Sequence, residues 1–319
     1  MANIFVFFFI FVLSLSSQTI YAAKFRLVNK CRHTVWPGLL SGANSPPLPT
    51  TGFSLSAGKS RTFHFPRSWS GRLWARTLCS GDPSAGKLVC LTGDCASGKL
   101  ECSGAGAIPP ATLAEFTLNG AGGLDFYDVS LVDGYNLPIL VVPRGGRGGD
   151  CSPTGCLVDI NRACPRELSV AAARGNGSVK VRSKTAVACK SACEAFGDPR
   201  YCCSESYNTP DTCPPSVYSV FFKEACPRAY SYAYDDKTST FTCGNADYII
   251  VFCPPPYTSL KLLGKRRVMA GELPLVNKTM MYLHSRGSKV SSGLTIPLLI
   301  VGTLIVVLRF VFWDLILVY

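Results

Sequence analysis

The stretch CLTGDCASGKLEC, residues 90–102, places three cysteines within one short segment. It belongs to a set of sixteen cysteines that runs from Cys31 to Cys253. These cysteines do not form paired Cys-x-x-Cys knuckles, and only three histidines could add imidazole ligands, so we expect no metal site. An even number confined to one block of the chain instead predicts eight disulfides formed in an oxidising compartment.

The N-terminal residues predict secretion, in agreement with the cysteines. The chain begins MANIFVFFFIFVLSLSSQTIYAA, in which an apolar run, residues 4–15, is followed by small and polar residues. This pattern is typical of a secretory signal peptide, here residues 1–22. Asn-x-Ser/Thr sequons at Asn176 and Asn277 predict glycosylation of the secreted chain.

The C-terminal region differs in composition from the cysteine block. Residues 255–293 form a basic linker with seven Lys or Arg and one acid, which supplies part of the formal net charge of +12. Residues 294–319 are mostly apolar but include Arg309 and Asp314. Two alternatives remain for this tail, a single-pass membrane segment and a cleaved signal for a lipid anchor. A nucleic-acid partner is not expected, because the chain reads as secreted and carries no nucleic-acid-binding motif.

Residues 23–254 are predicted to form one domain that is mainly β. Short runs rich in β-branched and aromatic residues are separated by Gly, Pro, Asn and Asp, which predicts a β-sandwich with cysteine-dense loops. Two short helices are predicted at residues 190–196 and 216–225. The predicted strands are KFRLVNK (24–30), RTFHF (61–65), RLWART (72–77), TLAEFTLN (112–119), FYDVSLV (126–132), LPILVV (137–142), GSVKVRS (177–183) and DYIIVFC (247–253).

The segment of residues 90–102, with Thr-Gly-Asp before its second cysteine, resembles the signature of thaumatin-like proteins, the fifth group of plant pathogenesis-related proteins. Further stretches agree, among them VNKCRHTVWPG, LWARTLC, FYDVSLVDGYNLP, YCCSE, SVYSVFFKEACP and TFTCGNADYIIVFCP. The resemblance implies two packed β-sheets, two disulfide-rich loop domains and an acidic cleft. The chain departs from the family in a longer loop between Cys164 and Cys189, and in Arg228, where the family often has Asp.

The same resemblance implies a disulfide pairing that spacing alone could not select. The implied pairs are Cys31–Cys253, Cys79–Cys90, Cys95–Cys102, Cys151–Cys243, Cys156–Cys226, Cys164–Cys189, Cys193–Cys202 and Cys203–Cys213.

The acidic cleft implied by the family maps onto one arginine and four acids of this chain, Arg72, Glu115, Asp128, Asp133 and Asp236. Strand alternation in TLAEFTLN places Glu115 on the polar face, away from Phe116 and Leu118. Asp128 and Asp133 are five residues apart, so they converge only if Asp133 lies in the turn that Asp-Gly-Tyr-Asn suggests. The neighbouring Asp125 is interpreted as a solvated strand end.

The resemblance implies a defence-associated surface protein that binds β-1,3-glucan or a related wall polysaccharide through this cleft. A second hypothesis is weak endo-β-1,3-glucanase activity, with Glu115 as the acid and Asp128 or Asp133 as its partner. A third is a non-catalytic surface protein in development or signalling. In each case we expect a monomer without a cofactor, attached to the outer face of the plasma membrane by its C-terminal tail.

Overall fold

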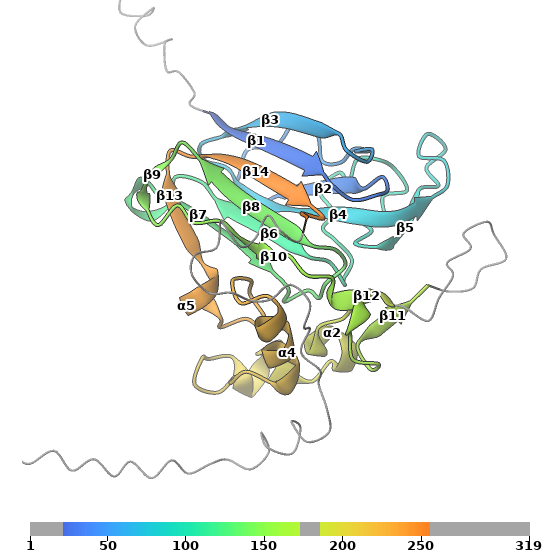
Figure 1. The fold of residues 1–319 in the computed structure, drawn as a ribbon, viewed down its shortest axis with the longest axis vertical. Coiled ribbons are helices and arrows are strands. Elements are labelled where there is room, and N and C mark those ends of the chain that lie inside the picture. Colours follow the sequence, from blue (N-terminus) through green and yellow to red (C-terminus); the bar gives the residue numbers. More distant parts are fainter. Residues whose placement is uncertain (1–21, 173–185, 256–319) are drawn as a thin grey trace, which may run out of the picture. The chain divides into compact units, whose positions relative to one another are not determined.

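The computed structural model describes residues 22–172 and 186–255, and these form mainly β-strands (Figure 1). Five strands make one sheet in the order β10-β8-β14-β1-β3. β1 and β14, which come from opposite ends of the domain, pair in parallel, and the other pairs are antiparallel. The bounds of these strands are β1 Ala22–Asn29, β3 Ser60–Pro66, β8 Ile139–Arg144, β10 Thr154–Cys156 and β14 Asp247–Phe252.

A seven-stranded sheet carries most side chains of the candidate site. Its order is β2-β4-β6-β7-β13-β9, with β5 paired to the end of β4, and its pairs are antiparallel. The bounds are β2 Trp36–Ser41, β4 Ser70–Ser80, β5 Val89–Thr92, β6 Leu113–Thr117, β7 Asp125–Ser130, β9 Arg147–Gly149 and β13 Phe241–Gly244.

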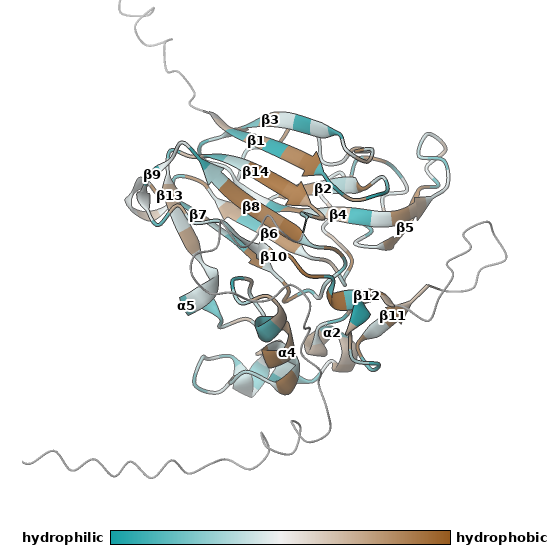
Figure 2. Ribbon diagram, viewed as in Figure 1, coloured by the Kyte–Doolittle hydropathy of each residue, from teal (hydrophilic) through white to brown (hydrophobic). Residues whose placement is uncertain are grey.

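Aromatic side chains join the inner faces of the two sheets. Phe25 on β1 meets Phe116 on β6 edge-on, with ring centroids 4.8 Å apart, and Tyr127 on β7 lies 5.3 Å from Tyr248 on β14. All four belong to one buried cluster, where each large apolar side chain contributes about 1.5–3 kcal/mol relative to exposure. Hydrophobic residues run almost without interruption along the central strands β8 and β14 (Figure 2). The predicted sandwich is confirmed.

Short helices and a two-stranded sheet make up a disulfide-rich loop domain. Both predicted helices are present, and the longer one begins after Ser216, whose Oγ accepts a hydrogen bond from the Ser219 N–H at 3.1 Å. The bounds of these elements are β11 Ser169–Ala171, β12 Ala186–Cys189, α2 Ala192–Phe196, α3 Pro199–Cys202, α4 Val217–Ala225 and α5 Asp236–Ser239. Single 3₁₀ turns lie at Ala121–Gly123, between β6 and β7, and at Ile160–Arg162 and Glu205–Tyr207.

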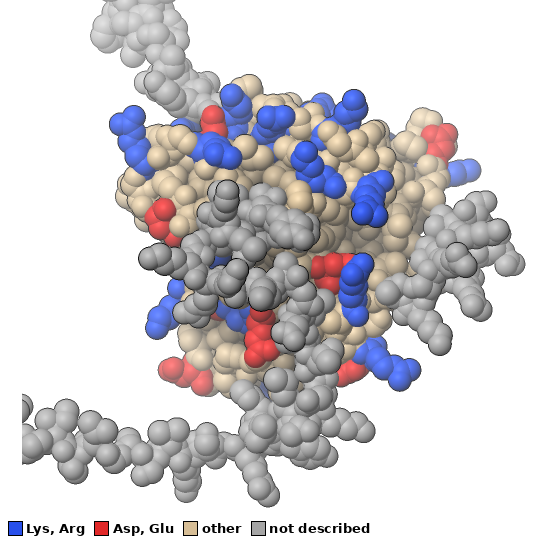
Figure 3. Space-filling view, in the orientation of Figure 1, with Lys and Arg blue, Asp and Glu red and all other residues tan. Residues whose placement is uncertain are grey.

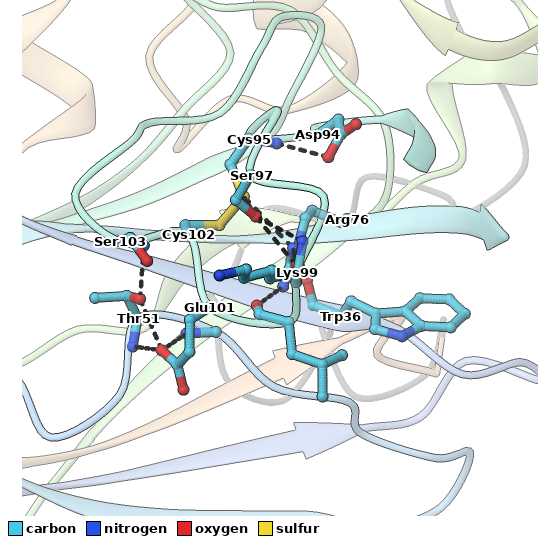
Figure 4. Close-up of a disulfide and its surroundings, with 12 residues drawn as sticks. Trp36, Thr51, Arg76, Asp94, Cys95, Ser97, Lys99, Glu101, Cys102 and Ser103 are labelled. Carbon is cyan, nitrogen blue, oxygen red and sulfur yellow. Dashed lines mark hydrogen bonds between the residues drawn. A yellow bond between two sulfur atoms is a disulfide. The ribbon is translucent and has the colours of Figure 1, made fainter. Parts of the chain in front are cut away.

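The loop of residues 90–102 is fastened to the sheet by buried polar groups (Figure 4). Arg76 on β4 points into this loop and donates hydrogen bonds to the carbonyl oxygens of Lys99 and Leu100. Asp94 of the Thr-Gly-Asp motif accepts from the N–H of Cys95 at 2.8 Å and from that of Cys90 at 3.3 Å. These hydrogen bonds fix the backbone at Cys90 and Cys95, each of which forms a disulfide.

Glu101 ties the other side of the loop to the segment before β3. Its carboxylate accepts hydrogen bonds from the hydroxyl of Thr50, from the hydroxyl of Thr51 and from the N–H of Gly52. Burial by itself would raise the pKa of Glu101. The hydrogen bonds outweigh this effect and hold the pKa of Glu101 below its usual range.

The structure contains the same eight disulfides that the resemblance implies, so the pairing is confirmed. They include two in the loop region beside β5 and four in the loop domain around α2, α3 and α4. The pairs are Cys31–Cys253, Cys79–Cys90, Cys95–Cys102, Cys151–Cys243, Cys156–Cys226, Cys164–Cys189, Cys193–Cys202 and Cys203–Cys213.

We predict that thiol labelling of the denatured, non-reduced protein finds no free thiol, because every cysteine has a partner. The same labelling after reduction should modify all sixteen cysteines. One or more equivalents of label before reduction would contradict the eight-bridge framework.

Asp125 corrects one expectation. Its side chain is fully buried rather than solvated, and it accepts a hydrogen bond from the Tyr248 hydroxyl at 2.9 Å. The nearest cation is Arg67, whose Nη1 lies 4.0 Å from Asp125 Oδ1. Asp125 shares its face of β7 with the buried Tyr127 and Val129, so strand alternation could have predicted its burial.

Several predictions lie outside the described residues. They are residues 1–21 of the predicted signal peptide (residues 1–22), the GSVKVRS strand, both sequons, the basic linker beyond Pro255 and the apolar tail. Among the helices of residues 22–172 and 186–255, none is long and apolar enough to cross a membrane.

Arg228, at which the chain departs from the family pattern, places its guanidinium over the ring of Phe241, 4.2 Å from the centroid.

Candidate functional site

A row of three charged side chains crosses neighbouring strands of the seven-stranded sheet. Arg72 on β4 lies directly opposite Glu115 on β6, and Glu115 lies directly opposite Asp128 on β7. Directly opposite residues have Cβ atoms about 4.5–5.5 Å apart, so the three side chains meet on one face. Arg72 Nε lies 3.8 Å from Glu115 Oε1. Phe116 and Leu118 point into the core, as strand alternation predicts.

Asp133 reaches the same place because β7 ends at Ser130 and a turn follows. The N–H of Gly134 donates to the carbonyl of Leu131 at 2.9 Å and closes this turn. Gly134 has a φ of 83°, and a Cβ there would lie 2.7 Å from the Cys189 carbonyl oxygen, so only glycine fits. Asp133 therefore lies in a turn, as expected, but this turn spans residues 131–134 and not the Asp-Gly-Tyr-Asn segment, whose Tyr135 pairs with Cys189.

The structure brings all five sequence-predicted residues onto one cavity of about 360 Å³. Asp236, the first residue of α5, supplies the side opposite the strands. Its neighbour Asp235 is not part of the lining. It pairs instead with Lys223 at 2.8 Å and accepts from the N–H of Ser231 at 3.0 Å.

Burial and mutual repulsion raise the pKa values of three of the acids. Burial raises the pKa of Asp128 well above its usual value, and the charges of Glu115 and Asp236 raise it further. The pKa of Glu115 is also raised by burial, but Arg72 opposes the shift while Asp133 adds to it. Burial raises the pKa of Asp133, again against Arg72. Asp128 is the acid farthest along the row from the arginine, and no cation among the described residues opposes the rise of its pKa.

Sequence reasoning missed Tyr230. Tyr230 lines the cavity, and its hydroxyl donates to Asp236 Oδ1 at 2.7 Å. Burial raises the pKa of Tyr230, so the phenol stays protonated and remains a donor. The repeated tyrosines of AYSYAYDD were a visible signal, but nothing in that pattern says which ring faces the acids.

One oxygen of Asp128 has no partner. Its Oδ2 is buried and makes no hydrogen bond to any residue that the structure describes. Leaving a buried polar atom unpaired costs about 1–3 kcal/mol, so the hydrogen bonds of the fold do not favour an ionised carboxyl group at this position.

The acids are not arranged to hold a metal ion. In the described part of the chain, no group of three or more His, Cys, Asp or Glu side chains has metal-binding geometry. Exposed basic side chains instead gather over the β1 and β3 edge of the other sheet (Figure 3), where they include Lys24, Arg26 and Arg61. These basic side chains lie on a different sheet from the strands that carry the acids of the cleft.

Comparisons with known proteins identify the family of the chain. A model of the thaumatin family matches residues 29–254. The chain is 56% identical over 237 residues to thaumatin-like protein 1 of Arabidopsis thaliana, covering 73% of this chain and 86% of that protein. It is 54% identical over 235 residues to a glucan endo-1,3-beta-glucosidase of Prunus avium, covering 73% and 91%. It is 55% identical over 233 residues to pathogenesis-related thaumatin-like protein 3.5 of Cryptomeria japonica, covering 73% and 90%.

Proposed function

Because the chain belongs to the thaumatin family, we propose that its acidic cleft binds a neutral polysaccharide of the β-1,3-glucan type. The observation that carries this proposal is the convergence of one arginine, four acids and the Tyr230 side chain on a single cavity that is rich in hydrogen-bonding groups. A sugar offers hydroxyls at many positions of its ring and brings no charge into a site whose acids already repel one another. An anionic ligand would add to that repulsion.

Each cavity group has a role in such binding. Glu115, beside Arg72, accepts hydrogen bonds from sugar hydroxyls as a carboxylate, and Asp133 adds further acceptor oxygens. Asp128 in its protonated form both donates and accepts. Tyr230 fixes Asp236 at the opposite wall, so the cavity is formed before a ligand arrives.

Hydrolysis of the glucan is a second candidate function. The favouring observation is that one carboxyl group of a directly opposed pair, Asp128, has a pKa raised well above its usual value while the other, Glu115, faces an arginine. Asp128 would protonate the leaving glycosidic oxygen as its bond to the anomeric carbon breaks. Glu115 would attack that carbon or take a proton from an attacking water. This reverses the sequence-based hypothesis, in which Glu115 is the acid.

The biological setting is also a proposal. The relatives' names include a pathogenesis-related protein and a glucanase, which supports a defence role directed at wall glucans. Secretion rests on the apolar N-terminal residues 4–15, and attachment to the outer face of the plasma membrane rests on residues 294–319.

We expect Glu115→Gln to weaken binding of the full chain to β-1,3-glucan about tenfold or more. Hydrogen bonds to a charged acceptor are worth about 1.5–3 kcal/mol, and the amide keeps the shape but loses the charge. Binding is measured by co-sedimentation with insoluble β-1,3-glucan and by calorimetry with a soluble oligomer. Glu205→Gln makes the same change at an exposed position away from the cavity and should bind like the wild type.

Equal glucan binding by the wild type and by Glu115→Gln would contradict the proposed role of the cleft. Absence of binding by the wild type would overturn the glucan proposal itself. Release of reducing ends from a soluble β-1,3-glucan, measured on the same samples, separates the two candidate functions.

A further inference from the structure

The charged row is flanked by two depressions and not one. The 360 Å³ cavity, here called the acidic half, lies on the side of Asp133, Tyr230 and Asp236. A second depression of about 240 Å³, here called the apolar half, is lined by the side chains of Leu40 and Phe126 together with small residues of the strands. Arg72, Glu115 and Asp128 line both depressions, so the two halves meet at the carboxylates.

Strand register fixes the order of these features. Ser70, Thr117 and Phe126 form a second row across β4, β6 and β7, parallel to the charged row. Successive residues on one face of a strand are about 6.6–6.8 Å apart, so this row lies one side-chain step from the carboxylates. Leu113 and Ser130 form the next row on the other side and line the acidic half. The site therefore extends along the strands in both directions from the carboxylates.

The two halves differ in chemistry. Among the described residues, only the three shared side chains bring charge to the lining of the apolar half. Phe126 is half-buried and directly opposite the exposed Thr117, so its ring contributes an apolar wall beside a hydroxyl. A sugar ring has the matching character, because its C–H groups form an apolar face and its hydroxyls form a polar rim.

We propose that one polysaccharide chain occupies both halves, lying along β4, β6 and β7 with a sugar unit against Phe126 and the following units in the acidic half. The cleft then recognises an internal stretch of polymer and not a single terminal sugar. This inference rests on the proposed glucan function and adds that Phe126 sets the chain length that the site requires.

The test compares a short and a long β-1,3-linked glucose oligomer, a dimer and a hexamer, on the full chain by calorimetry. The wild type should bind the hexamer more tightly than the dimer, because only the hexamer fills both halves. Phe126→Ala should weaken hexamer binding about tenfold and remove most of this difference. Phe126→Tyr keeps the ring and should retain the preference for the hexamer. Phe196→Ala removes an exposed ring on α2, outside both halves, and should change neither affinity.

Thr117→Met provides an independent variant in case Phe126→Ala does not fold. It narrows the apolar half from an exposed position and should likewise lower the preference for the hexamer. Wild-type binding with an unchanged hexamer preference in both Phe126→Ala and Thr117→Met would overturn the two-half cleft and leave the proposed function standing. No binding of either oligomer by the wild type would overturn both.

Discussion

Replacing Arg76 with methionine should lower the free energy of unfolding by about 3–5 kcal/mol, the largest single effect that we expect in this chain. Arg76 is completely buried. Its guanidinium donates to the carbonyl oxygens of Trp36, Lys99 and Leu100 at 2.5–3.1 Å. Methionine retains much of the packing volume but leaves these carbonyls without a donor, and each buried unpaired group costs about 1–3 kcal/mol. Urea or thermal unfolding of both proteins measures the loss.

The matched control is Arg72→Met, the same change on the same strand. Arg72 shares its face of β4 with Arg76, but 43% of its side chain is exposed and its partner Glu115 is also partly exposed. A partly exposed ion pair contributes about 0–1 kcal/mol, so this variant should unfold close to the wild type. Equal losses in the two variants would show that the stabilisation comes from arginine packing on β4 and not from capping of the loop.

The role of Arg76 shows where the sequence stops being informative. The sixteen cysteines and the Thr-Gly-Asp segment predict the domain and, through the family resemblance, the disulfide pairs. Nothing in RLWART tells that one of its arginines is half-exposed and the other buried, because both occupy the same face of one strand. The difference arises from the loop of residues 90–102, which covers one end of that face and leaves the other open.

The candidate site divides in the same way. Alternation places Glu115 on the polar face, and turn chemistry lets Asp133 join it, so both positions follow from local rules. The contributions of Tyr230 and Phe126 depend on strand register and on the placement of α5, which are long-range properties. Asp125 is buried although an acidic residue is expected to be exposed, because strand alternation places it on the inner face of β7. Its buried bond to Tyr248 comes from the opposing sheet.

Replacing Asp128 with asparagine should raise stability and abolish hydrolysis, two opposite effects from one change. Asparagine has nearly the same shape and cannot ionise, so it avoids the ionisation that burial and the charges of Glu115 and Asp236 disfavour in the folded state. We expect the melting temperature at neutral pH to rise about 2–4 °C, which corresponds to about 1 kcal/mol for a domain of this size. Any hydrolysis of β-1,3-glucan should fall about 10²–10⁴-fold, because the amide cannot donate a proton as an acid. Binding should change less than tenfold, since the amide still donates and accepts hydrogen bonds.

The stability gain must depend on pH in one direction. The pKa of Asp128 is raised in the folded protein, so the folded state holds this proton more tightly than the unfolded chain does. Wild-type stability from this group is therefore fully present below the ordinary aspartate pKa of about 3.9, and it is lost as the pH rises from there through the folded-state pKa. Asparagine has no such loss. The variant should thus match the wild type at about pH 3 and exceed it increasingly toward neutral pH.

Melting curves of both proteins between about pH 3 and pH 7, together with Asp211→Asn as an exposed control, test this expectation. A pH-independent gain, or a gain of the same size in Asp211→Asn, would mean that the repulsion around Asp128 is not what the substitution relieves. A stabilised variant that still releases reducing ends at the wild-type rate would remove Asp128 from the chemistry. Asp128 lowers the stability of the fold when it is charged and is needed only when a glucan is present. Its position therefore serves the ligand and not the fold.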